Sequence, residues 1–212
     1  SKDSIIEYSK KIIDFFLKKR VEIIIIACNS ASSVALKDFQ SIYKNVTIIG
    51  MIEPSVEYIV NYTNLKSISI IGTETTIKSN SYIEAFSDYN YKLYSLSCPL
   101  FVPLVEEGFV SGDLLEKVMD HYFSDLRISP DCVILGCTHY PFIKSKIHDY
   151  FAGKARILSS GECLINDFPG EKSLNQKSSN LNLFFTDKPD HFTQKALELL
   201  KLEPNKIEWV GI

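Results

Sequence analysis

Several patterns that assign a protein to a functional class are absent from this chain of 212 residues. No apolar run approaches the ~20 residues needed to span a bilayer, and the start carries no signal-peptide pattern. Lysines and arginines form no dense run interleaved with aromatic residues, and the formal net charge is only -3. We therefore expect a soluble, cytoplasmic protein that binds neither nucleic acid nor membranes.

The fingerprints of nucleotide and metal binding are also missing. Neither G-x-G-x-x-G after a strand nor G-x-x-x-x-G-K-[ST] occurs. The five cysteines are scattered without a compact framework, so we expect free thiols in a reducing compartment. Cys132, Cys137 and His139 lie close in sequence but lack the C-x-x-C spacing. The two cysteines would also point to opposite faces of a strand, so we expect no metal there.

The elements that are present alternate along the chain. Apolar residues make up 45% of the sequence and charged residues 23%, which are ordinary globular values. Strands are predicted at 21–27, 46–50, 67–71, 91–96, 132–135, 155–158, 181–185 and 207–210, and helices at 4–19, 33–44, from 53, 76–87, 113–126, from 141 and 189–200. This alternation predicts an α/β fold with mostly parallel sheets.

Two segments repeat one arrangement at the ends of strands. Residues 23–30 read IIIIACNS, and residues 132–139 read CVILGCTH. Each is an apolar strand followed by a small residue, a cysteine and two polar residues, and each precedes a helix. Ligands of parallel α/β sheets bind beyond the carboxyl ends of the strands. Cys28 and Cys137 are therefore expected at such ends, where two similar units would offer one thiol to each side of a bound molecule.

The setting of these two cysteines suits reactive thiols. A cysteine between a strand and a helix lies near the positive end of the helix dipole and near oriented N–H groups, which favour the thiolate. The small residue before it leaves room for a ligand. A lone cysteine at a strand end is more often a buried packing residue, but the matched polar neighbours of this pair favour a functional interpretation.

The same segments resemble a known family. ACNSAS at 27–32 and LGCTHYP at 135–141 are similar to the two signature motifs of the cofactor-independent glutamate racemases, in the aspartate/glutamate racemase superfamily. Further similar segments follow the family's order: IEPSV at 52–56, IGTETTIKSNSY at 71–82, CPLFVPLVEEG at 98–108 and LFFTDKPDHFTQKALELL at 183–200. The resemblance covers essentially the whole chain.

The resemblance implies a two-base racemisation of glutamate without pyridoxal phosphate, metal or any other cofactor. Cys28 and Cys137 match the two catalytic cysteines, one acting as a thiolate base and the other as a thiol acid. The product D-glutamate would supply peptidoglycan synthesis. The implied partner is a small-molecule substrate, glutamate, and members of the family are often homodimers.

The resemblance also assigns the polar residues around the cysteines. His139 matches an acid/base partner of its neighbouring cysteine, and Glu106 matches an acidic residue near the site, although the sequence does not separate it from Glu107. Thr73 and Thr76 open a helix, so capping is an additional explanation for them. The matched substrate-binding residues are Asn29, Ser30, Thr73, Thr76, Thr138 and His139. Threonine is commoner in the family at the position of Ser30.

The family's architecture implies two pseudo-symmetric α/β domains with the active site in the cleft between them. The expected division is discontinuous: 1–55 plus 166–212 form the first domain, and 56–165 the second. Family members begin with a strand carrying Asp-Ser-Gly and a loop with Pro-Tyr-Gly. The sequence resembles a member lacking roughly the first 40–50 residues, the size of a strand–helix unit plus a loop.

Other functions stay open at this point. A truncated scaffold would suit a catalytically impaired or non-catalytic ligand-binding protein. Aspartate racemase is the nearest alternative activity, although the GCTHYP, IEPSV and VEEG segments favour glutamate. Thiol redox chemistry with Cys28 and Cys137 as a disulfide pair is a third alternative, which titration of free thiols before and after reduction would test.

Overall fold

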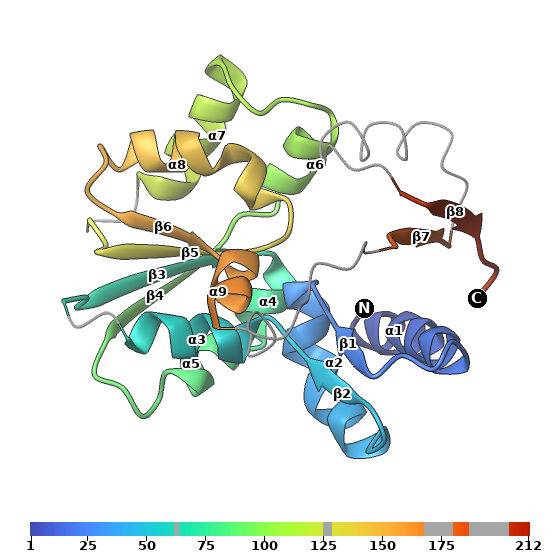
Figure 1. Cartoon of the computed structure of the whole chain (residues 1–212). Helices are drawn as coiled ribbons and strands as arrows, with labels where there is room; N and C mark the ends of the chain where they lie inside the picture. Colours follow the sequence, from blue (N-terminus) through green and yellow to red (C-terminus); the bar gives the residue numbers. More distant parts are fainter. Residues whose placement is uncertain (62–63, 125–128, 168–179, 187–203) are drawn as a thin grey trace. The chain divides into compact units, whose positions relative to one another are not determined.

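The computed structural model describes residues 1–61, 64–124, 129–167, 180–186 and 204–212 (Figure 1). The chain divides into two compact units, Ser1–Phe168 and Pro169–Ile212. The helix predicted at 189–200 lies outside the described residues. The discontinuous division into 1–55 plus 166–212 and 56–165 stays a prediction.

A four-stranded parallel sheet forms the centre of the first unit. Its strands lie in the order β4-β3-β5-β6, which places the two most buried strands in the middle. Their bounds are β3 (Ser67–Gly72), β4 (Lys92–Ser97), β5 (Cys132–Gly136) and β6 (Arg156–Ser159). Gly72 pairs with Gly136, so the carboxyl ends of β3 and β5 coincide at one edge. The predicted parallel α/β architecture is confirmed.

Helices cover both faces of this sheet (Figure 1). One apolar cluster packs Val133, Leu135 and Ile157 under α6 (Phe101–Glu106), α7 (Asp113–Phe123), the 3₁₀ helix η1 (Tyr140–Ile143) and α8 (Lys144–Tyr150). The other packs Ile70 and Ile134 under α3 (Ile52–Val60), α5 (Ser81–Ala85) and α9 (Ser160–Asp167). Burial on both faces explains why β5 reads as a continuous apolar run, CVILG. β3 is also buried on both faces, but it carries Ser67 and Ser69 among its isoleucines.

A smaller parallel sheet joins β1 (Ile23–Ile25) to β2 (Thr47–Ile49). The helices α1 (Lys2–Lys18) and α2 (Asn29–Ile42) pack on it through a third cluster that includes Ile13, Ile24 and Phe39. Ile24 is buried, whereas its neighbours Ile23 and Ile25 are exposed, which is the period-two pattern of a strand with one covered face. This sheet ends at the segment that leads into Cys28.

Several element boundaries differ from the sequence-based expectation. The helix predicted at 33–44 begins earlier, at Asn29, with Cys28 as its N-cap residue. The helix predicted at 76–87 is two short helices, α4 (Glu74–Lys78) and α5. Asn80 separates them with φ of 57°, a left-handed conformation that asparagine tolerates better than most residues. At the start, Ser1 caps α1 by accepting from the amide of Ser4.

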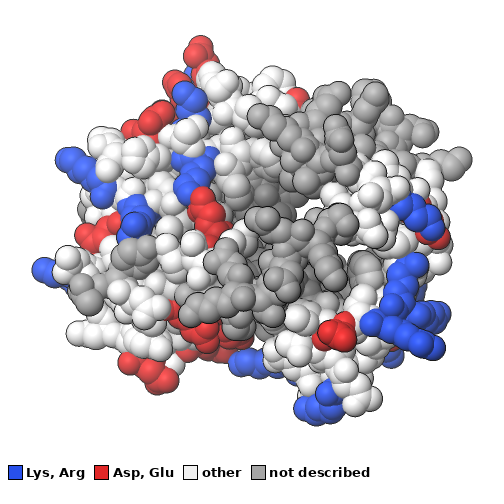
Figure 2. Space-filling model, in the orientation of Figure 1, with Lys and Arg blue, Asp and Glu red and all other residues white. Residues whose placement is uncertain are grey.

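The second unit contains two described strands, β7 (Asn182–Phe185) and β8 (Lys206–Trp209), which pair in parallel. Within the described ranges, no helix is long and apolar enough to cross a membrane. Acidic and basic side chains are both spread over the face drawn in Figure 2, in keeping with the small net charge.

Candidate active site

Cys28 lies between β1 and α2. It is the N-cap residue of α2, and its carbonyl accepts the first helical hydrogen bond from Ser32, at 2.9 Å. Its side chain is exposed, while the other four cysteines are buried. The chain leaving β1 therefore places this thiol at the start of α2, where the first backbone amides have no hydrogen-bond partner inside the helix.

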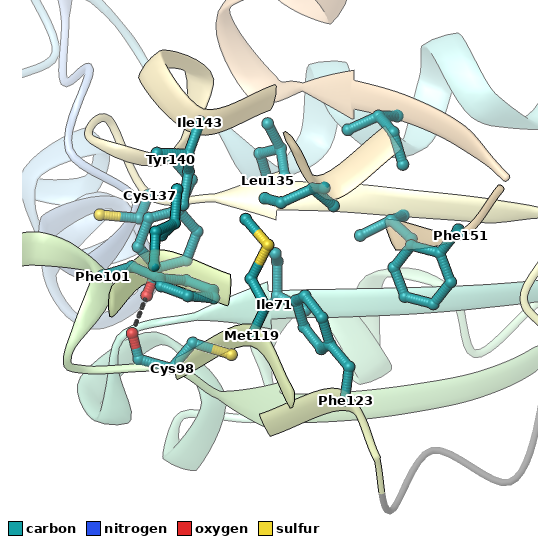
Figure 3. Packing of buried hydrophobic residues seen from close by; sticks show 14 of the residues in the cluster. Ile71, Cys98, Phe101, Met119, Phe123, Leu135, Cys137, Tyr140, Ile143 and Phe151 are labelled. Atoms are coloured by element: carbon teal, nitrogen blue, oxygen red, sulfur yellow. Dashed lines mark hydrogen bonds between the residues drawn. The ribbon is translucent and has the colours of Figure 1, made fainter. Parts of the chain in front are cut away.

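Cys137 follows β5 directly and precedes η1. It is 7% exposed and lies at the edge of the aromatic cluster that includes Phe101 and Tyr140, with its sulfur pointing away from Leu135 and Phe151 (Figure 3). Burial raises the pKa of this thiol, and the negative charges of Cys28 and Glu106 raise it further; hydrogen bonds from the His139 and Tyr140 amides oppose the rise. Cys28 is thus an electrostatic neighbour of Cys137.

His139 connects Cys137 to Glu106. The imidazole Nε2 lies 3.0 Å from Oε1 of Glu106, and Nδ1 lies 3.8 Å from the sulfur of Cys137. An ionised carboxylate only accepts hydrogen bonds, so Nε2 carries the proton and, in the neutral ring, Nδ1 is an acceptor that faces the thiol. The Oγ1 of Thr138 lies 3.4 Å from the same Nδ1.

A cluster of three hydroxyl groups lies at the starts of α2 and α4. Ser30 Oγ is 2.7 Å from Thr73 Oγ1 and 3.2 Å from Thr76 Oγ1, and the two threonine oxygens are 3.2 Å apart. Thr73 also caps α4 by accepting from the amide of Thr76. The structure therefore brings Ser30 to two threonines more than 40 positions away in the sequence. Thr73 both caps α4 and belongs to the cluster.

Asn29 is 1% exposed, and both ends of its amide are hydrogen-bonded. Its Nδ2 donates to Ser160 Oγ at 3.0 Å, and its Oδ1 accepts from the hydroxyl of Tyr82 at 2.8 Å. Burial raises the pKa of Tyr82, which keeps that hydroxyl protonated as a donor. Sequence reasoning missed Tyr82 and Ser160. The only available signal was that Tyr82 ends the IGTETTIKSNSY segment.

The small residue before Cys137 has a structural explanation. A Cβ built on Gly136 would lie 3.0 Å from the carbonyl oxygen of Ile71 on the adjacent strand. Such contacts are tighter than close packing tolerates without a backbone shift. The sequence analysis explained the small residue here by the room that a ligand needs. In the structure, the backbone of β3 occupies the space next to Gly136.

Other features bear on cofactors and ligands. All five cysteines are free thiols. Across the described ranges, no group of three His, Cys, Asp or Glu residues is placed to hold a metal ion. A hollow of about 530 Å³ lies between α2, α3 and α5, and neither Cys28 nor Cys137 lines it.

The family model described as Asp/Glu/Hydantoin racemase matches residues 7–167. The chain belongs to this racemase family. The match includes both cysteine motifs and the four-stranded sheet, and it makes the protein an isomerase. The family resemblance drawn from the motifs is thereby confirmed.

Several members of the racemase family are similar to this chain over most of their length. The glutamate racemase of Aquifex aeolicus is 39% identical over 204 residues, 95% of this chain and 77% of that protein. The crystal structure of glutamate racemase from Campylobacter jejuni has a TM-score of 0.87 at 31% identity, covering 95% of this chain and 82% of that one. The Francisella tularensis glutamate racemase in complex with D-glutamate has a TM-score of 0.86 at 31% identity, covering 100% and 81%.

Proposed function

We propose that the chain interconverts L- and D-glutamate by proton transfer between two cysteines, supplying D-glutamate for peptidoglycan. The observation that carries this proposal is the placement of the two thiols. Cys28 is the N-cap residue of α2 after β1, Cys137 directly follows β5 and precedes η1, and the charge of Cys28 raises the pKa of Cys137. The glutamate specificity follows the related racemases, which are 31% to 39% identical.

The reaction needs one thiolate and one thiol. The thiolate takes the α-proton to form an S–H bond, and the electron pair of the broken C–H bond moves into the carboxylate of the substrate. The second thiol then gives its proton to the opposite face of the α-carbon, which leaves the second sulfur as a thiolate. The reverse reaction exchanges the two roles. No redox change or cofactor is needed in this scheme.

Cys137 is suited to begin as the thiol, because burial raises its pKa. In the opposite direction it must lose its proton, and His139 is the group that faces it. We assign His139 as the acid/base partner of Cys137 and Glu106 as the carboxylate that fixes its ring orientation through the 3.0 Å bond. Thr138, which is exposed beside them, is assigned to substrate binding.

The hydroxyl and amide groups near Cys28 are the proposed binding groups for the substrate. Neutral donors stabilise the negative charge that develops on the carboxylate without adding a competing base. We assign this role to Ser30, Thr73 and Thr76, which already cluster within 3.2 Å of one another. Asn29 is included with them, because its bond to Ser160 uses one of the two hydrogens on Nδ2.

Three wider assignments accompany this function. We propose a cytoplasmic location, where reducing conditions keep the five thiols free. We also propose a homodimer, which analytical ultracentrifugation would test. The third assignment is the discontinuous domain division of 1–55 plus 166–212 and 56–165, which limited proteolysis of the full chain would test.

The decisive experiment is proton NMR of each glutamate enantiomer with the protein in heavy water. We expect loss of the α-proton signal from both L- and D-glutamate, with much slower loss from the aspartate enantiomers. Cys28→Ala and Cys137→Ala should each lower racemisation by at least about 100-fold. Cys163→Ala removes a buried cysteine outside the site and should leave the rate unchanged.

Other outcomes distinguish the alternatives. Faster exchange of aspartate than of glutamate would make the chain an aspartate racemase. Glutamate binding by calorimetry without exchange in either enantiomer would indicate a non-catalytic binding protein. Dialysis against EDTA should not change the rate, because the two thiols carry the proton transfer.

A further inference from the structure

We propose that Tyr82 and Ser160 are positioning residues of the two-thiol site. They hold Asn29 by both ends of its side-chain amide and thereby fix the start of α2, with Cys28, relative to the strand that carries Cys137. This inference rests on the proposed function, because it concerns the distance between the two thiols that share the proton transfer.

The three side chains form a buried chain of hydrogen bonds. Tyr82 is 3% exposed, Asn29 1% and Ser160 5%, so water does not compete for these bonds. Tyr82 O–H donates to Asn29 Oδ1 at 2.8 Å, and Asn29 Nδ2–H donates to Ser160 Oγ at 3.0 Å. Loss of either partner would leave a buried amide atom unsatisfied, which is more unfavourable than loss of an exposed hydrogen bond.

Each anchor belongs to the part of the fold that carries Cys137. Ser160 is the first residue of α9 and follows β6, and β6 pairs with β5 up to Leu135 opposite Ser159. Tyr82 packs in the apolar cluster that includes Ile134 of β5. Asn29 is the first residue of α2, immediately after Cys28. The hydrogen bonds of Asn29 thus connect the support of one thiol to the support of the other.

Other connections cross the same boundary without touching Asn29. Ser30 Oγ lies 2.7 Å from Thr73 Oγ1 and 3.2 Å from Thr76 Oγ1. Ser81 Oγ donates to the backbone carbonyl of Ser33 at 3.0 Å, one turn along α2. This bond restrains the helix axis without touching its first residue. Removal of the Tyr82 hydroxyl should therefore leave α2 in place, held by Ser30 and Ser33, while Asn29 and the adjacent Cys28 thiol gain freedom.

The test compares Tyr82→Phe with the wild type using glutamate deuterated at the α-carbon. A displaced thiol slows its own proton transfer, and misplacement by about 1 Å can lower a rate by up to about 100-fold. We expect kcat/KM to fall between about 10- and 100-fold. The isotope effect on kcat/KM should rise for the enantiomer that Cys28 deprotonates and fall for the other.

The opposite movement of the two isotope effects separates positioning from simple loss of folded enzyme. An isotope effect is a ratio of rates, so a smaller folded fraction leaves both values unchanged. His139→Asn perturbs the other thiol and should move the two isotope effects in the reverse sense. Tyr43→Phe is the matched control: it removes a tyrosine bond to Asp14 in the α1–α2 cluster and should leave both values unchanged.

Ser160→Ala removes the other anchor and should reproduce the isotope pattern of Tyr82→Phe, which keeps the proposal testable if one variant fails to fold. The proposal would be overturned if both isotope effects stayed unchanged in Tyr82→Phe and Ser160→Ala. It would also be overturned if they moved in the same directions as in His139→Asn. A readout independent of catalysis is alkylation of Cys28, the exposed cysteine, by iodoacetamide. We expect it to be about threefold faster in Tyr82→Phe, because a less restrained helix start lets the already exposed thiol take up more orientations that the reagent can reach.

The alkylation rate also separates this inference from the proposed function. If the wild type exchanged no α-proton but Tyr82→Phe still accelerated alkylation, the racemase assignment would fail and the positioning role would stand. If the wild type were active and Tyr82→Phe changed neither the alkylation rate nor the isotope effects, the positioning role alone would fail.

Discussion

The imidazole of His139 bridges Glu106 and Cys137, with Nε2 at 3.0 Å from the carboxylate and Nδ1 at 3.8 Å from the sulfur. Oriented in this way, the ring presents an acceptor to a buried thiol whose pKa is raised by burial. The structure also shows which of the two adjacent glutamates contacts the imidazole, a point that the sequence alone left open. Glu106 contacts the ring, whereas Glu107 is the C-cap residue of α6.

Glu106→Gln tests the charge of this carboxylate. Glutamine keeps an acceptor for Nε2–H but loses the negative charge, so the ring stays oriented while the imidazolium form loses its stabilisation. We expect kcat to fall about tenfold, measured by circular dichroism of glutamate at pH 8. Glu107→Gln is the matched control and should match the wild type. Equal rates for the two variants would remove Glu106 from the mechanism.

Ser30→Ala tests the hydroxyl cluster. Loss of this oxygen leaves Thr73 and Thr76 with one partner fewer and removes a donor for the substrate carboxylate. We expect KM for glutamate to rise about tenfold, with little change in the melting temperature. Ser30→Thr keeps the hydroxyl and should stay near wild type. Ser41→Ala, near the exposed end of α2, is the control. An unchanged KM in Ser30→Ala would contradict the binding assignment.

Gly136→Ala tests the close approach of β5 and β3. The added methyl group would lie 3.0 Å from the Ile71 carbonyl oxygen, and neither central strand can move freely. We expect the free energy of unfolding to fall by about 1–3 kcal/mol in urea titrations. Gly161→Ala adds the same group where no atom lies within 4 Å, so it should be neutral or slightly stabilising. Equal midpoints for the two variants would refute this explanation of Gly136.

Cys132 makes stability depend on alkaline pH. Burial raises the pKa of its thiol to about 12, whereas an unfolded cysteine ionises near ~8.5. Below the unfolded value both states are protonated and the contribution to stability is complete. Between the two values only the unfolded state ionises, so stability falls by up to about 1.4 kcal/mol per pH unit.

Cys132→Ala should therefore flatten the fall in stability between pH 9 and about 10.5, measured by urea unfolding at fixed temperature. Cys98 and Cys137 act in the same direction, because burial raises the pKa of both, so part of the slope should persist. An undiminished slope in Cys132→Ala would contradict the buried-thiol explanation.

Local sequence patterns determined the architecture and the candidate chemistry. The apolar run at 132–135 became the central strand β5, because a strand covered on both faces can be apolar throughout. The isoleucine-rich segment at 67–71 became the other central strand, β3. The repeated strand–small residue–cysteine pattern placed Cys28 and Cys137 at strand ends. The family inferred from these motifs is the family of the chain.

The tertiary structure alone decided which distant residues meet. Asn29 bonds to Tyr82 and Ser160, and no short-range pattern relates these positions, because the pairing depends on how α2 packs against α5 and α9. The break at Asn80 was also hidden, since a single left-handed residue leaves the helical periodicity of the sequence intact. Periodicity records which face of an element is buried, whereas hydrogen-bond partners between elements are set only when those faces come together.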